Sequence, residues 1–274
     1  MSVRTLSVPT GSTPPVLEIR NFAGSVLIDA VEGADTVDVR IEALDSAAEQ
    51  VLERIELAAD PAGPDGAVRV RVAVPNRALW RTPAFAVTVR TPSDARVSVA
   101  AAAADVEVRG RAGRLELTVA SGNVTVDECA EFQVRSASGD VRVGTTAGRG
   151  ALSSASGDLH VGSARGGLEV RTASGGVSIG DCGGDVSVSS ASGDITVGAA
   201  SAGSLRLKTV SGDVSIGIVP GLRLWLDLSS VSGRMRSELA DDAAGDDGPA
   251  ELSLALRSVS GDLRIHRAAQ ATAA

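Results

Sequence analysis

The chain has 274 residues, a formal net charge of −8 at pH 7, and only 2% aromatic residues, with no tyrosine. An acidic balance disfavours nucleic acids and anionic membrane surfaces as partners, because both attract basic proteins. Scarce aromatic side chains also disfavour surfaces that stack sugars or bases.

The N-terminal sequence MSVRTLSVPTGSTPPV contains no apolar run of signal-peptide length, and no segment reaches the ~18 apolar residues of a membrane helix. We therefore expect a cytoplasmic protein without a membrane-spanning segment.

Residues 1–109 are rich in strand patterns but lack a tight repeat. Apolar and polar residues alternate, as in half-buried strands, over 16–22, 24–30, 36–44, 67–75 and 84–92. The spacing of apolar residues predicts one helix near 45–57, capped by Asp45 or Ser46. We interpret this section as irregular solenoid rungs that, with the helix, cap a more regular structure.

A ten-residue phrase recurs through the rest of the chain. When the copies are aligned on the glycine of their Ser-Gly pair, the intervals are 17, 18, 18, 18, 19, 21 and 28 residues. A period held over many copies indicates a repeat architecture. The aligned glycines are Gly122, Gly139, Gly157, Gly175, Gly193, Gly212, Gly233 and Gly261.

Each repeat contains two short strands joined by an Ala-Ser-Gly or Val-Ser-Gly turn. The positions seven and five residues before the glycine, and two and four after it, are nearly all valine, leucine or isoleucine, with polar residues between them. Two strands and two corners per ~18 residues predict a single-stranded parallel β-solenoid, whose rungs stack at ~4.8 Å. We place this all-β solenoid at 110–267, a polar surface loop at 240–249, and a disordered tail at 268–274.

Two further expectations concern packing. The residue before each turn serine is alanine in the first five repeats and valine in the last three, which suggests a tight inward-facing corner. The rung formed by residues 251–266 is aliphatic, comes last in the sequence and has no obvious cap, so we expect it to end the solenoid.

The turn aspartates are the first candidate site. They are Asp140, Asp158, Asp194, Asp213 and Asp262. We interpret them as structural turn residues. A ladder of cations bridging stacked carboxylates is the alternative, but the glycine–aspartate spacing differs from that of calcium-binding solenoids.

Cysteines and histidines indicate no metal site. Cys129 and Cys182 occupy equivalent positions three repeats apart, beyond disulfide reach, so we expect reduced corner residues. His160 is expected to be a solvated surface residue and His266 to lie in the last strand or the tail. We expect no catalytic residue, metal or cofactor.

Trp225 lies between two inward-facing leucines and should point outward, close to Arg223 and within reach of Arg234 and Arg236. An exposed tryptophan among arginines is typical of a contact surface. Packing beneath the 240–249 loop is an equally good interpretation, and Trp80 is similarly ambiguous.

The recurrent S-G-[DN]-[VIL] turn resembles that of a bacterial β-helix family of unknown function called "putative adhesin". Two leading elements match as well, the strand Gly24–Ile28 (G-S-V-x-I) and the segment Val72–Pro75 (V-x-V-P). Gly176 and Arg234 depart from the turn pattern. The resemblance implies a β-helix and no established activity.

These observations favour a non-enzymatic scaffold or interaction protein, adhesin-like in shape, with a macromolecular partner that we expect to be a protein. The alternative is a cytoplasmic filament or oligomer that assembles through its terminal rungs. A polysaccharide-active β-helix enzyme is a second alternative, which would need a groove lined by paired carboxylates.

Overall fold

The computed structural model describes residues 2–60, 66–75, 82–239 and 250–268. The chain divides into two compact units, Met1–Val143 and Gly144–Ala274, and strand β9 (Val141–Thr146) crosses the boundary. Strands dominate both units, and the fold is the predicted parallel β-solenoid. Both the 240–249 loop and Trp80 lie outside the described residues, as does the tail from 269 onward.

The described part of the first unit contains eight strands before β9 and one short helix. Helix α1 spans Ser46–Val51 and continues as a 3-10 turn, Leu52–Arg54. The strands are β1 (Val3–Pro9), β2 (Val16–Val31), β3 (Thr36–Ala43), β4 (Glu56–Asp60), β5 (Arg69–Ala73), β6 (Phe85–Pro92), β7 (Arg96–Ser121) and β8 (Val124–Ser138).

The long strands β2 and β7 bend at a corner, so each contributes to two walls of the solenoid. The first part of β2, 16–20, pairs in parallel with β5 and with 96–100 of β7. The second part, 24–30, pairs in parallel with β6 and with 104–110 of β7. β7 and β8 then pair one repeat apart, with Leu115 opposite Phe132.

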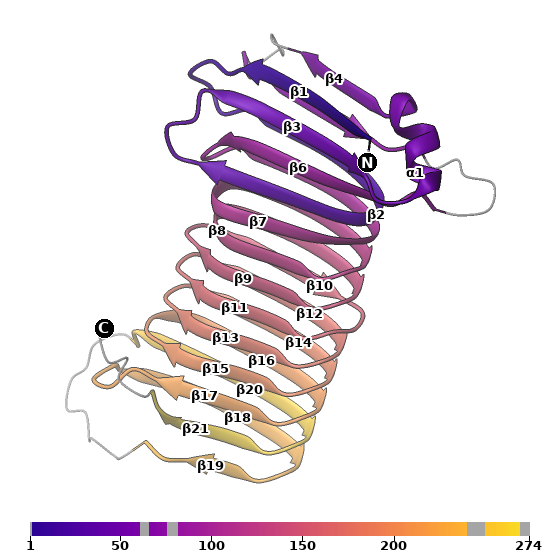
Figure 1. Cartoon of the computed structure of the whole chain (residues 1–274). Coiled ribbons are helices and arrows are strands. Elements are labelled where there is room, and N and C mark those ends of the chain that lie inside the picture. The colour runs from indigo at the N-terminus through magenta and orange to yellow at the C-terminus, as the bar shows by residue number, and fades with distance from the viewer. Residues whose placement is uncertain (1, 61–65, 76–81, 240–249, 269–274) are drawn as a thin grey trace. The chain divides into compact units, whose positions relative to one another are not determined.

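Antiparallel strands finish the N-terminal side of this unit (Figure 1). β6 pairs with β3 and β3 with β1, both antiparallel, while β5 pairs antiparallel with β4 on the other wall. Asp45 caps α1 by accepting a hydrogen bond from the Ala48 N–H at 2.7 Å. The helix is shorter than predicted, because residues from Glu56 onward pair with β5 and leave helical geometry at Ile55.

In the second unit, successive strands alternate between two walls. The strands are β10 (Gly150–Ser154), β11 (Leu159–Ala164), β12 (Leu168–Ser174), β13 (Val177–Cys182), β14 (Val186–Ser192), β15 (Ile195–Ala200), β16 (Gly203–Ser211), β17 (Val214–Ile218), β18 (Leu224–Ser232), β19 (Met235–Ser237), β20 (Leu252–Ser260) and β21 (Leu263–Arg267).

Parallel pairing in register stacks the predicted apolar columns directly. On one wall β10, β12, β14 and β16 pair in that order, so that Leu168 lies opposite Val186 and Val186 opposite Leu205. On the other wall β11, β13, β15 and β17 do the same. Leu168, Val186 and Leu205 are 3%, 1% and 0% exposed, so the aliphatic ladders are the core.

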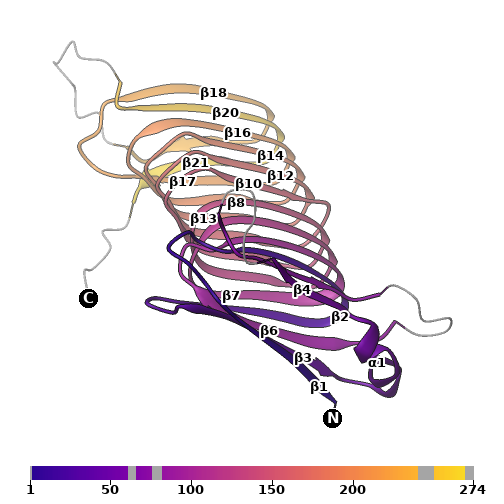
Figure 2. The same ribbon diagram turned by 90° about the horizontal axis from the view of Figure 1, so that it is seen from above.

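The rungs near the C-terminus do not follow the order of the sequence (Figures 1 and 2). β20 lies between β16 and β18, and β21 lies between β17 and β19. The rung at 251–266 is therefore internal, and the expectation that it ends the solenoid is wrong. The inward-facing residues explain why the rung at 251–266 is internal. It has the aliphatic Ile265 at the position where the outer rung has Ser237, and burial favours the aliphatic residue.

The predicted inward alanine and valine column is exposed. Ala173 follows Thr172, and the period-two alternation from Leu168 and Val170 directs Thr172 inward and Ala173 outward. The residues that fill this corner are a column of buried hydroxyl side chains, which the alternation directs inward. Its buried members are Ser136, Ser154, Thr172, Ser190, Thr209 and Ser258.

Most of these hydroxyls bond to the turn that follows them. Thr172 Oγ1 donates to the Ser174 carbonyl at 3.0 Å and Thr209 Oγ1 to the Ser211 carbonyl at 3.1 Å. Each bond satisfies a polar group in the corner next to the turn glycine. Ser190 and Ser258 differ, because their buried Oγ atoms have no hydrogen-bond partner among the described residues.

The turn glycines are required by close backbone approach. Gly193 has φ +125°, and a Cβ placed there would collide with the carbonyl oxygen of Gly175 in the preceding rung. Any other residue would be both strained and blocked.

We predict that Thr172→Val will lower the free energy of unfolding by about 1 kcal/mol, because the Ser174 carbonyl loses its donor. Ala173→Leu should change it by less than about 0.5 kcal/mol, because the side chain is exposed. Ser190→Ala, which removes an unsatisfied hydroxyl, serves as the control and should not destabilise. Urea titration measures all three, and an equal loss for Thr172→Val and Ser190→Ala would contradict the hydrogen-bond role.

Both cysteines are buried thiols. Burial raises the pKa of the Cys182 thiol to about 11, and the nearby Asp181 carboxylate adds to the effect. The reactive thiolate is thus scarce below that pH.

We predict that iodoacetamide at pH 8.5 will modify Cys182 slowly in native protein and rapidly in urea, as followed by peptide mass spectrometry. Fast native labelling would contradict the burial.

Candidate interaction surface

The rung formed by β18 and β19 ends the second unit and is open on one side. β18 pairs with β20 and β19 with β21, and within the described residues no strand pairs with their other edges. Unpaired edges present backbone N–H and C=O groups to solvent in the geometry that another strand would bind.

The inward side chains of this rung are uncovered. In one column Leu205 and Leu254 are 0% exposed, whereas Leu226 is 39% exposed. On the other wall Leu263 is 1% exposed and Met235 is 55% exposed. The hydrophobic core of the solenoid is therefore open at this rung, because no further strand of the described part of the chain covers it. We call Leu226, Met235 and the outer edges of β18 and β19 the end surface.

Apolar residues also point outward beside the end surface. Trp225 is 52% exposed and Val231 is 81% exposed, near opposite ends of β18. Val259 and Val210 continue the valine column on β20 and β16. Clustered exposed apolar side chains mark interaction sites more often than scattered ones do.

The structure does not gather the predicted contact residues into one patch. Arg223 lies beside Trp225, where its guanidinium binds Glu251 at 3.4 Å. Arg234 and Arg236 lie beyond the Gly233 turn, and Arg236 belongs to β19 on the other wall. Trp225 and Arg236 thus point outward from different walls of the same rung.

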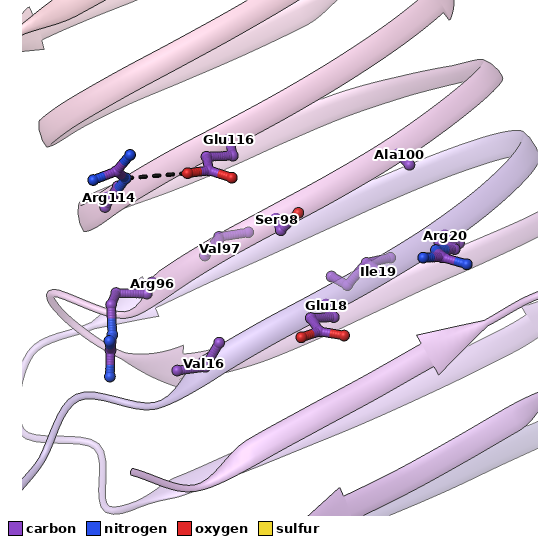
Figure 3. A pocket seen from close by; sticks show the side chains of 10 residues that line it. All are labelled: Val16, Glu18, Ile19, Arg20, Arg96, Val97, Ser98, Ala100, Arg114 and Glu116. Atoms are coloured by element: carbon purple, nitrogen blue, oxygen red, sulfur yellow. Dashed lines mark hydrogen bonds and ion pairs between the residues drawn. The ribbon is translucent and has the colours of Figure 1, made fainter. Parts of the chain in front are cut away.

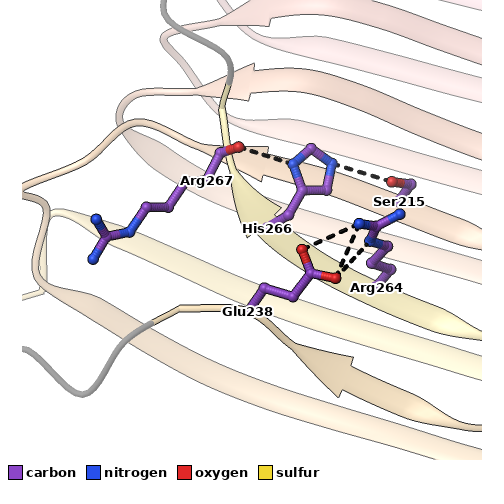
Figure 4. A network of polar contacts seen from close by, with 5 residues as sticks. All are labelled: Ser215, Glu238, Arg264, His266 and Arg267. Carbon is purple, nitrogen blue, oxygen red and sulfur yellow. Dashed lines mark hydrogen bonds and ion pairs between the residues drawn. The ribbon is translucent and has the colours of Figure 1, made fainter.

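The outer rung is tied to β21 by polar contacts (Figure 4). Arg264 binds Glu238 through two hydrogen bonds, each of 3.1 Å. These hydrogen bonds hold the pKa of the Glu238 carboxyl below its usual range. His266 lies in β21, as one of the two alternatives expected, and its ring contacts the Ser215 hydroxyl at 3.3 Å.

The turn aspartates form a ladder in which carboxylates accept hydrogen bonds from backbone N–H groups of the neighbouring rung. Asp194 Oδ1 accepts from the Asp213 N–H, Asp213 Oδ1 from the Asp262 N–H, and Asp262 Oδ1 from the Arg234 N–H, each at 2.8 Å. Each carboxylate thus serves the next rung outward. Arg234 occupies the turn position of the outer rung and brings no carboxylate with which to continue the ladder.

The ladder also runs through the first unit, where Asp105 accepts from the Asn123 N–H and Asn123 from the Asp140 N–H. Among the described residues, no cluster of three histidine, cysteine or acidic side chains is arranged to hold a metal ion. His160 is exposed on β11.

The walls carry two open hollows that the sequence did not indicate. One, of about 550 Å³, lies in the first unit where Ser98 and Ala100 form a low floor between longer side chains (Figure 3). Arg114 at its border binds Glu116 at 3.2 Å. The other, of about 490 Å³, lies around Glu169 and Arg206 in the second unit. Hollows that are bordered by ion-paired side chains are better suited to hold solvent than to bury a ligand.

We predict that Asp213→Ala will lower the free energy of unfolding by about 1 kcal/mol, because the Asp262 N–H loses its acceptor. Asp213→Asn, which keeps an acceptor oxygen, should lose less. Neither calcium nor EDTA should shift the melting temperature of the wild type. A calcium-dependent rise that Asp213→Ala abolishes would favour the cation ladder instead.

No helix in the described ranges is both long and apolar enough to span a membrane. A comparison with curated proteins gives no match.

Solved structures resemble the chain over nearly its whole length. One is a putative adhesin from Bacteroides fragilis NCTC 9343, with 15% identity, 96% of this chain and 97% of that chain covered, and a TM-score of 0.48. A putative adhesin from Parabacteroides distasonis ATCC 8503 has 10% identity, 96% and 97% coverage, and a TM-score of 0.41. A putative lipid binding protein from the same strain has 9% identity, 97% and 96% coverage, and a TM-score of 0.36.

The sequence itself identifies the family. A family model described as Toastrack DUF4097 matches residues 86–266, which include the turn repeats, the later part of the first unit and most of the second. The resemblance drawn from the S-G-[DN]-[VIL] turns is confirmed, and this chain belongs to the Toastrack DUF4097 family.

Proposed function

We propose that this protein is a non-enzymatic interaction protein that binds another protein chain at its end surface. One observation carries the proposal: the aliphatic core, 0% exposed at Leu254, is 39% exposed at Leu226 in the next rung. An exposed cross-section of core is costly in water, and burial by a partner recovers about 25 cal/mol for each square ångström covered.

The walls support a structural rather than a catalytic role. The turn carboxylates accept backbone hydrogen bonds, as Asp213 does from Asp262, and so are occupied in holding the rungs together. Acidic and basic side chains along the walls pair locally, as Arg171 does with Glu169. Catalysis by carboxylates requires groups that are directed toward a substrate.

We further propose that the protein works in the cytoplasm. Its two cysteines are buried thiols, which fits a reducing compartment. A partner found there would have to tolerate the acidic surface, so a protein is favoured over a nucleic acid.

Photo-crosslinking in cells tests the proposal. A benzophenone amino acid replaces Trp225, beside the end surface, or, as the matched control, Ser187, which is exposed on β14 well inside the same wall. We expect a discrete adduct from position 225 and none from 187. The adduct mass, compared with 27.5 kDa for one chain, distinguishes self-association from binding of another protein.

The result against the proposal is equally clear. If positions 225 and 187 give the same adducts, or if neither gives any, the end surface is not an interaction site.

A further inference from the structure

We propose that the partner at the end surface is a second copy of this chain, joined edge to edge by antiparallel pairing of β18 with β18. This inference rests on the proposed function, because it names the occupant of the same surface. Its support comes from the outer rung, the register that β18 allows, and the other free edges of the chain.

The partner that best covers the exposed apolar core at the end surface is a second end surface. Leu226 and Met235 are the outermost members of two buried ladders, and the surface they form is a section through a β-solenoid core. An occupant must cover both walls at once and must present strand edges at the same separation. A second end surface does both, and interfaces of obligate homodimers resemble a core cut in half.

Antiparallel pairing centred on Leu228 gives a complementary set of contacts. A two-fold axis through residue 228 places Trp225 opposite Val231 of the second copy, and Asp227 opposite Ser229. Trp225 and Val231 are the two most exposed large apolar side chains on β18, at 52% and 81%. An aromatic residue opposite a β-branched one is a favourable cross-strand pair.

The register centred one residue earlier is less favourable. Centring the pairing on residue 227 places Asp227 opposite Asp227, where like charges repel. Centring on 228 separates these carboxylates and offers each a serine hydroxyl, Ser229, as hydrogen-bond donor. Charge and apolar contact therefore select the same register.

Continued stacking in one direction is disfavoured by the aspartate ladder. The three rungs nearest the outer one each supply a turn carboxylate, Asp194, Asp213 and Asp262, to the next rung, but the outer rung has Arg234 at that position. In a further parallel rung, the turn N–H would need an acceptor at this position, where the outer rung offers only the Arg234 guanidinium, a donor. The contact is thus isologous, which closes a dimer and does not extend a filament.

The other free edges of the chain do not match the end surface. Within the described ranges, β1 and β4 each pair with one strand only, and both pair antiparallel. Glu56 and Asp60 stand at the two ends of β4, and β1 carries Arg4. Charged residues on edge strands discourage the association of edges, so a head-to-tail contact would leave the apolar section poorly covered.

Sedimentation velocity of the purified full chain tests the proposal over a hundredfold concentration range. We expect a monomer–dimer equilibrium, and we expect Val231→Lys to raise the dissociation constant more than tenfold, because it places a charge against Trp225 of the second copy. Val210→Lys is the matched control. It changes a valine of the same outward column, 55% exposed but two rungs inside the edge, and should leave the equilibrium unchanged.

Cysteine cross-linking then tests the register. Trp225→Cys and Val231→Cys are purified separately and oxidised either alone or mixed. In the proposed register only the mixture places the two new thiols opposite one another. Identical positions on the two copies lie about 20 Å apart, since six residues separate 225 from 231, which is beyond disulfide reach. We expect covalent dimers from the mixture only.

Each contrary result has a definite meaning. A monomer at every concentration, or a dimer that Val231→Lys leaves intact, overturns the second copy as occupant. Equal cross-linking in the separate and mixed samples overturns the register and with it the edge-to-edge pairing. A monomeric protein that still gives a heavier, position-225-specific adduct in cells would disprove the homodimer and leave the proposed function standing.

Discussion

The stacking of the repeats depends on the close approach of each turn to the turn before it. A side chain at Gly193 would collide with the carbonyl of Gly175, and one at Gly175 would collide with the carbonyl of Gly157. This contact sets parallel register at the corner, and the register in turn stacks Leu168, Val186 and Leu205 into one ladder. The buried hydroxyls and the turn aspartates then satisfy the polar groups that such a tight corner creates.

Period and alternation were enough to predict the fold, because each is repeated many times and every copy supports the same interpretation. The corner was misread because alanine at position 173 suggested burial by its size, whereas the alternation that begins at Leu168 already placed Thr172 inside. The size of a residue is thus a weaker indicator of burial than its place in the strand alternation. The order of the last rungs could not be read in this way, because the repeats at 224–237 and 251–267 each fit the pattern and only comparison of Ser237 with Ile265 separates them.

The end surface was only partly foreseen for the same reason. Trp225 and the arginines stood out as residue types, but their role depends on the rung they occupy, and rung order is a long-range property. The inward residues Leu226 and Met235 looked like ordinary core members in the sequence. They become candidate contacts only because β20 and β21, which come later in the sequence, pair on the inner side of β18 and β19. Leu226 and Met235 are thereby left in the outer rung. Exposure at this site thus results from topology rather than composition.

The inserted rung also has a consequence for biosynthesis. A solenoid can ordinarily add each turn to the last as the chain leaves the ribosome, since every contact is local. Here β16 pairs with residues 49 positions later, Leu205 with Leu254, and β18 must wait until β20 has been made. The strands β18 and β19 are therefore synthesised before the strands that they pair with. Completion of this part of the fold is deferred until β20 has been made, and loss of residues 251–274 would leave β18 without the strand it pairs with.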